Sequence, residues 1–232
     1  MDGVKPRLSS ERRATRSQPG LRAGISLNSS PLLRLLAGWG VAEVAPPALS
    51  LAERWSPWLA WTDAITLSAV LGAGVPVAAA GPRQAADVAA AISAVKRLRQ
   101  ALTQAIDNGA GLAAGAPDEP GLAGLRRQYL AQQRAMDEAI APVRTQVRAA
   151  LTGQGSDLAR LAALDVVLDE ALAARQRRLL ATVPAWLEKS VKRASASLPA
   201  ASAQMQRALL AELDLRLQPI EGLVDALARG PA

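Results

Sequence analysis

The 232-residue chain contains no cysteine, no histidine and no phenylalanine, and aromatic residues make up only 3% of it. Without cysteine there can be no disulfide, no thiolate metal site and no cysteine nucleophile, and without histidine the commonest general base and metal ligand are missing. The composition therefore removes most of the residue types on which enzyme and zinc chemistry depends. We expect a protein with no enzymatic activity and no cofactor.

Three residue types dominate what is present: 51 alanines, 35 leucines and 23 arginines. Alanine, leucine and arginine are strong helix formers, and no stretch shows the alternation expected of a strand. The sequence thus predicts an all-α fold, an elongated antiparallel helical bundle with coiled-coil-like C-terminal helices. The formal net charge is +7, and residues 1–30 carry six basic and two acidic groups.

Residues 1–29 are predicted to form a disordered basic arm, because they contain too little apolar surface to offset the entropy of ordering. They also lack the apolar core of a signal peptide, so we expect no export by that route. The arm's arginines are candidates for contact with an anionic polymer through counterion release. These candidates are Arg7, Arg12, Arg13, Arg16 and Arg22.

An N-terminal helical unit is expected over residues 30–108. Its first helix starts at Ser30-Pro31, a capping residue followed by the proline that favours a first helical position. A second helix is expected over about 51–71 and a third over about 84–108, closed by Asp107-Asn108-Gly109. Residues 64–82 are uncharged, but glycines and prolines interrupt their second half, so we expect no membrane-spanning helix.

Residues 109–121 are rich in glycine, alanine and proline and are predicted to form a flexible linker. A second unit is expected over 122–229, where a long helix ends near Gly153 and a short gap makes an antiparallel hairpin with a helix capped by Ser156. Pro142 should bend the first of these helices, and Thr182-Val183-Pro184 marks a break. The seam of the first helix is predicted at Leu125, Tyr129, Gln132, Met136, Ile140, Val143, Val147 and Leu151, and that of the second at Leu158, Leu161, Leu164, Leu168, Leu172 and Leu179.

Trp55, Trp58 and Trp61 fall at three-residue steps, so they sweep across one side of the predicted second helix. Two interpretations stand: these side chains anchor a core otherwise thin in large residues, or they form a docking face for a partner. Trp39 fits either interpretation. All four tryptophans are candidate partner-binding residues.

No group of residues predicts catalysis or metal binding. Asp165, Asp169 and Glu170 could supply carboxylate ligands, but no inward histidine or matching acidic pair accompanies them, and a solvated acidic face is the better interpretation. Glu188 with Lys192 and Glu212 with Arg216 have the spacing of ion pairs along one helix. Under a scaffold function, polar seam residues such as Gln132 and Arg175 would set the register between helices.

Several blocks of sequence resemble one bacterial family, called domain of unknown function 3348. They are PLLRLLAGWGVAEV (31–44), WLAWTDAITLSAVL (58–71), RRQYLAQQRAMDEAI (126–140), DLARLAALDVVLDEAL (157–172), LLATVPAWLEK (179–189) and LLAELDLRLQPIEGLVDAL (209–227). The family carries no known reaction, so the resemblance transfers no catalytic residue. Its members are encoded near membrane proteins with an OmpA-like peptidoglycan-binding partner, so the resemblance implies an envelope-associated complex.

We therefore expect a cytoplasmic bacterial scaffold or adaptor, free or peripheral to the inner membrane, that acts by self-association or by docking to a larger complex. Its protein partner is not identified by the sequence. Two alternatives remain: a basic protein that binds nucleic acid without sequence specificity, and a lipid-surface protein anchored by the tryptophan-rich helix. Nucleic acid is the less expected partner, because no recognition helix or stacking aromatics accompany the basic residues.

Overall fold

The computed structural model describes residues 30–40, 61–72, 82–113 and 121–230. These residues form seven helices and no strand, which confirms the all-α prediction. Four of the helices are long: α4 (Pro82–Ala113), α5 (Leu122–Thr152), α6 (Ser156–Leu180) and α8 (Leu198–Arg229). The shorter ones are α1 (Pro31–Gly38), α3 (Trp61–Gly72) and α7 (Val183–Arg193).

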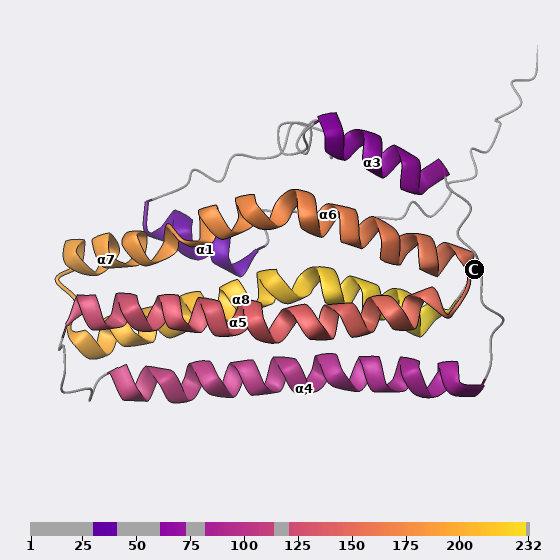
Figure 1. Ribbon diagram of the computed structural model, residues 1–232. Coiled ribbons are helices and arrows are strands. Elements are labelled where there is room, and N and C mark those ends of the chain that lie inside the picture. Colours follow the sequence, from indigo (N-terminus) through magenta and orange to yellow (C-terminus); the bar gives the residue numbers. More distant parts are fainter. Residues whose placement is uncertain (1–29, 41–60, 73–81, 114–120, 231–232) are drawn as a thin grey trace, which may run out of the picture.

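The long helices lie side by side with alternating direction (Figure 1). Helices α4 and α6 run one way along the bundle, and α5 and α8 run the other. Side-chain contacts agree with this arrangement: Asp107 of α4 bonds Gln206 near the start of α8, whereas Arg99, earlier on α4, reaches Glu221 near its end. Helices α5 and α8 pack against each other at the centre, with α4 on one side and α6 with α7 on the other. Helix α3 lies on the outer side of α6, and α1 contacts α8.

The core is built from leucine and alanine, as the composition predicts. Tyr129, Met136 and Met205 supply the bulk that the missing phenylalanines would otherwise provide, and all three are fully buried. Ala201 and Ala208 on α8 are also inaccessible to solvent. Because alanine has a small side chain, these positions allow neighbouring helix backbones to approach closely.

The predicted seam of α5 is confirmed at most positions: Leu125, Tyr129, Met136, Ile140, Val147 and Leu151 are buried. Two details differ. The buried glutamine is Gln133, one residue beyond the expected Gln132, and Val143 is only partly buried. In α6 the seam prediction is wrong at Leu179, which is half exposed, while the next residue, Leu180, enters the core.

Within the described residues, helix boundaries agree with the predictions except at two places, and the predicted start of the second helix near residue 51 lies outside those residues. Helix α4 does not stop at Asn108-Gly109 but continues to Ala113, so the residues from Gly109 to Ala113 are helical where the sequence predicts the linker. Ser156 is the first residue of α6 and makes no capping bond. Gly155 stands at the cap with φ 133°, a backbone conformation that favours glycine. The predicted break before Pro184 is confirmed, because α6 ends at Leu180 and α7 begins at Val183.

Helix α4, which the sequence groups with the N-terminal residues, packs against α5 and α8. Its residues Ala91, Val95, Leu102 and Ile106 belong to the same cluster of buried side chains as the seam of α5. In the described part of the chain, no helix is both long and apolar enough to cross a membrane.

Candidate functional site

The candidate binding residues from the sequence lie mostly outside the described part of the chain. The arginines Arg7, Arg12, Arg13, Arg16 and Arg22 are outside it, and so are Trp55 and Trp58. Trp61 is the first residue of α3. Trp39 is buried, with 7% of its surface exposed, and it packs in the core cluster. The structure therefore places Trp39 in the interior and not on a free surface.

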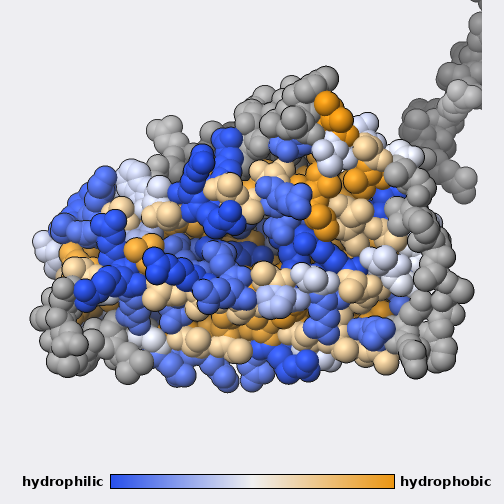
Figure 2. Space-filling model, viewed as in Figure 1, coloured by the Kyte–Doolittle hydropathy of each residue, from blue (hydrophilic) through white to orange (hydrophobic). Residues whose placement is uncertain are grey.

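Helix α3 leaves one side uncovered. It packs on α6, with Leu67 and Val70 partly buried, while Ile65 and Leu71 are 54% and 57% exposed. Figure 2 shows apolar surface gathered over α3 and the part of α6 beneath it. Asp63 is the one charged residue of this helix. A helix that packs on the bundle and exposes large aliphatic side chains among small ones has the pattern of a docking element. We call the exposed positions Ile65 and Leu71 the α3 face.

A polar network lies at the centre of the bundle, where α5 meets α8. Glu212 is fully buried, and its carboxylate accepts hydrogen bonds from the Tyr129 hydroxyl at 3.0 Å and the Gln133 amide at 2.9 Å. Arg216, one turn further along α8, donates to the same carboxylate through Nε at 2.9 Å and Nη2 at 2.7 Å. Arg216 also pairs with Asp137 of α5. The spacing of Glu212 and Arg216 predicts their ion pair, and the structure shows that the pair is buried.

The same network reaches a third helix, because the Gln133 side chain also donates to the backbone carbonyl of Leu180 at the end of α6 at 2.9 Å. Burial and the adjacent Glu212 carboxylate raise the pKa of Tyr129, so its hydroxyl stays protonated and acts as a donor. The sequence offers Gln132 as the residue that sets register. In the structure, the glutamine that enters the core is Gln133, and Arg175 is exposed on α6.

A second network joins α5 to α6. Arg144 donates to both oxygens of Asp165 at 2.8 and 2.6 Å and to Asp169 at 2.5 Å. Arg148 contacts the same two aspartates at 2.7 and 2.9 Å. The side chain of Asp165 is only 9% exposed, so the expectation of a solvated acidic face is wrong here. Asp165 lies between two arginines because α6 packs this side against α5.

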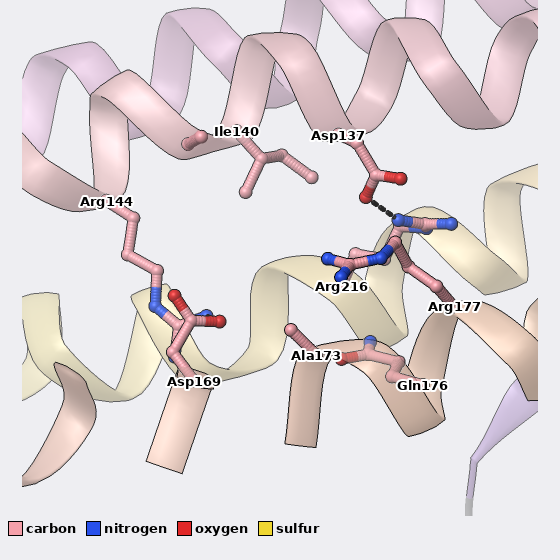
Figure 3. Close-up of a pocket in the computed structure, with 9 residues that line it drawn as sticks. Asp137, Ile140, Arg144, Asp169, Ala173, Gln176, Arg177 and Arg216 are labelled. Carbon is pink, nitrogen blue, oxygen red and sulfur yellow. Dashed lines mark hydrogen bonds and ion pairs between the residues drawn. The ribbon is translucent and has the colours of Figure 1, made fainter. Parts of the chain in front are cut away.

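Between the two networks is an open cleft of about 220 Å³, bordered by α5, α6 and α8 (Figure 3). Its charged lining consists of Asp137, Arg144, Asp169, Arg177 and Arg216, and its apolar lining includes Ile140. Figure 3 shows Arg177 reaching from α6 into the end of the cleft that holds Asp137 and Arg216.

The chemistry of the cleft is limited by its own ion pairs. Asp137, Asp169, Arg144 and Arg216 are each paired with another charged residue. Among the described residues, no group of three His, Cys, Asp or Glu could hold a metal ion. The cleft can therefore admit water or a small polar molecule, but its side chains are mainly engaged in holding the helices together.

Basic side chains gather at one end of the bundle. The start of α5, the end of α6 and the whole of α7 lie together there, and α5 packs against α7. We call residues 122–134 and 174–193 the basic end. These two segments contain nine basic residues and one acid, Glu188. The basic residues, all exposed, are Arg126, Arg127, Arg134, Arg175, Arg177, Arg178, Lys189, Lys192 and Arg193.

Two contacts at the basic end use its lysines. Lys192 pairs with Glu188 at 2.7 Å, as the sequence predicts, and this contact lowers the pKa of the Glu188 carboxyl. The ammonium of Lys189 lies 4.5 Å from the centre of the Trp186 ring, a cation–π contact. The sequence does not predict this concentration of charge, because residues 122–134 and 174–193 are about forty residues apart.

The fold and these surfaces define an all-α bundle protein held together by buried leucines and two polar networks. The family model described as "Protein of unknown function (DUF3348)" matches residues 21–206 and 190–229. The chain therefore belongs to this family, as the resemblance of its sequence blocks indicates. No curated protein and no solved structure matches the chain.

Proposed function

We propose that this protein is a non-enzymatic helical scaffold or adaptor that docks a protein partner, or a second copy of itself, through the α3 face. The observation that carries the proposal is the exposure of Ile65 and Leu71 on a helix that is itself attached to the bundle. Removing two such side chains from water favours association, since each buried aliphatic side chain contributes about 1.5–3 kcal/mol. The buried polar side chains of the bundle pair with one another, and this supports a structural role for the interior.

The partner surface implied by the α3 face is an apolar helix or groove. Asp63 lies in the first turn of this helix and its other described side chains are uncharged, so the recognition would depend on shape and apolar contact more than on charge. We also propose that the protein is located in the cytoplasm, either free or at the inner membrane as part of an envelope complex.

Site-specific photo-crosslinking tests the proposal and captures the partner whatever its identity. A photoreactive residue in place of Ile65 or Leu71 should give a discrete higher-mass adduct in cells that express the full chain. The matched control is the same substitution at Ala86, which is exposed on α4 at the opposite side of the bundle. An adduct of twice the 24.1 kDa chain mass would identify self-association, and any other single mass a different partner.

The double substitution Ile65→Arg with Leu71→Arg should abolish that adduct when the probe is placed at Ser68, also exposed on α3. The melting temperature of this variant should stay close to that of the wild type, because both side chains are already exposed. The proposal fails if probes at positions 65 and 71 give no more adduct than the probe at position 86.

A further inference from the structure

The fold gathers positive charge at one end of the bundle. The basic end carries a net charge of +8, whereas the other described residues sum to −2. Neither value is visible in the overall charge of +7. A surface in which nine cations face solvent beside one carboxylate attracts polyanions and repels cations.

Three of these cations have no carboxylate partner among the described residues: Arg134, Arg177 and Arg178 are exposed and form no ion pair there. Two of the nearby carboxylates are already engaged. Glu188 pairs with Lys192, and Asp137, three residues after Arg134, is held by the buried Arg216. Ion pairs within the described chain therefore leave this end strongly positive.

Apolar side chains lie within the same surface. Leu179 follows Arg177 and Arg178 on α6, and half of its surface is exposed to solvent (50%). Trp186 of α7 is also partly exposed, with the Lys189 ammonium over its ring. Tryptophan beside basic residues is typical of the interface between a bilayer and water, where the ring meets the headgroup region.

We propose that the basic end docks onto the surface of a bilayer that contains anionic phospholipid. The guanidinium and ammonium groups would contact lipid phosphates, and Leu179 would reach the boundary between headgroups and acyl chains. A nucleic acid would satisfy the same cations, but its phosphates would leave the exposed leucine without an apolar partner. A bilayer accommodates both the basic side chains and the exposed leucine, so this surface fits a bilayer better than a nucleic acid. The inference does not depend on the α3 face.

Sedimentation with lipid vesicles tests the inference. The full chain should sediment with vesicles of 30% phosphatidylglycerol and 70% phosphatidylcholine in 0.1 M NaCl, and should stay in solution with pure phosphatidylcholine. Each basic residue near an anionic surface strengthens binding roughly fivefold. The variant Arg134→Glu, Arg177→Glu, Arg178→Glu should therefore bind at least tenfold more weakly.

The matched control is Lys96→Glu, Arg97→Glu, Arg229→Glu, which changes the net charge equally at exposed positions away from the basic end. Its partition onto the vesicles should remain within about threefold of the wild type, because screening limits interactions beyond roughly 10 Å. Leu179→Ser should weaken binding about fivefold with no change in charge, through loss of apolar burial. Thermal unfolding of each variant shows that it is folded.

Three results would overturn the inference. The first is a wild-type chain that does not sediment with the anionic vesicles. The second is an equal loss of binding in the two triple variants, which would assign the binding to net charge or to the N-terminal residues. The third is binding to a 20-base-pair DNA duplex, in the same buffer, that is tighter than vesicle binding and depends on the same three arginines.

Discussion

Glu212 is the residue through which three helices of the bundle are connected by polar contacts. It lies on α8, accepts from two side chains of α5, and one of these, Gln133, also bonds the end of α6. A buried carboxylate is costly unless it is paired and hydrogen-bonded, and here Arg216 supplies the opposite charge. These directional contacts require one alignment of the three helices, whereas leucine and alanine alone would tolerate several.

Tyr129, the single tyrosine of the chain, reports on this network. Burial and the Glu212 carboxylate raise its pKa, so its protonated form is favoured in the folded state. The stabilisation is fully present below the ordinary tyrosine pKa of about 10 and is lost as the pH rises above it. We expect tyrosinate absorbance near 295 nm to appear only together with loss of helical circular dichroism.

The matched variant is Tyr129→Phe, which removes the hydroxyl and leaves the ring. At neutral pH it should be less stable by about 1–2 kcal/mol in urea unfolding, since one acceptor site of Glu212 loses its donor. Above pH 10 its stability should fall less steeply than that of the wild type. A tyrosine that ionises near pH 10 while the protein stays folded would contradict the burial of this network.

At the scale of single helices, the spacing of apolar residues predicted which helix faces are buried. The residues that signal a helix start or stop predicted the helix ends less well. The seam of α5 follows three- and four-residue steps, so its buried positions could be read from the sequence, apart from the choice between the adjacent glutamines Gln132 and Gln133. The end of α4 could not, because Asn108 and Gly109 are tolerated in a helix that packs against α5 and α8. Tertiary packing outweighed the stop signal there.

The junction between α5 and α6 depends on Asp165, which is held by Arg144 and Arg148. Replacing it by asparagine would leave two partly buried guanidinium groups with only Asp169 to balance them. We expect Asp165→Asn to lower the free energy of unfolding by about 2–3 kcal/mol. Glu170→Gln, an exposed acid on the same helix, should change it by less than about 0.5 kcal/mol. Urea denaturation followed by circular dichroism compares the two, and equal effects would refute the role of Asp165.

The whole molecule has a core shared between residues that the sequence assigns to two units. Helix α4 covers α5 and α8, and its apolar stripe is continuous with theirs. Figure 1 shows this helix along the full length of the bundle. The charge distribution is likewise a property of the whole fold, because the basic end is assembled from segments that the sequence keeps apart. Sums over consecutive residues could not have predicted it.

Fragments of the chain test where the cooperative unit begins. A fragment of residues 82–230 retains α4 and should unfold in one sharp transition by circular dichroism. A fragment of residues 122–230 lacks α4 and would expose the apolar face that α4 covers on α5 and α8, so we expect a broad transition or aggregation. A sharp transition in both fragments, with similar midpoints, would instead show that residues 122–230 are an independent domain.

The spacing of Glu212 and Arg216 has a consequence for the order in which the chain folds. The two charges belong to one helix and lie a single turn apart, so the helical turn holds them at pairing distance. Burying either charge before the turn forms would leave it without its partner in a dry environment. We therefore expect the turn of α8 that carries this pair to form before α5 packs against it.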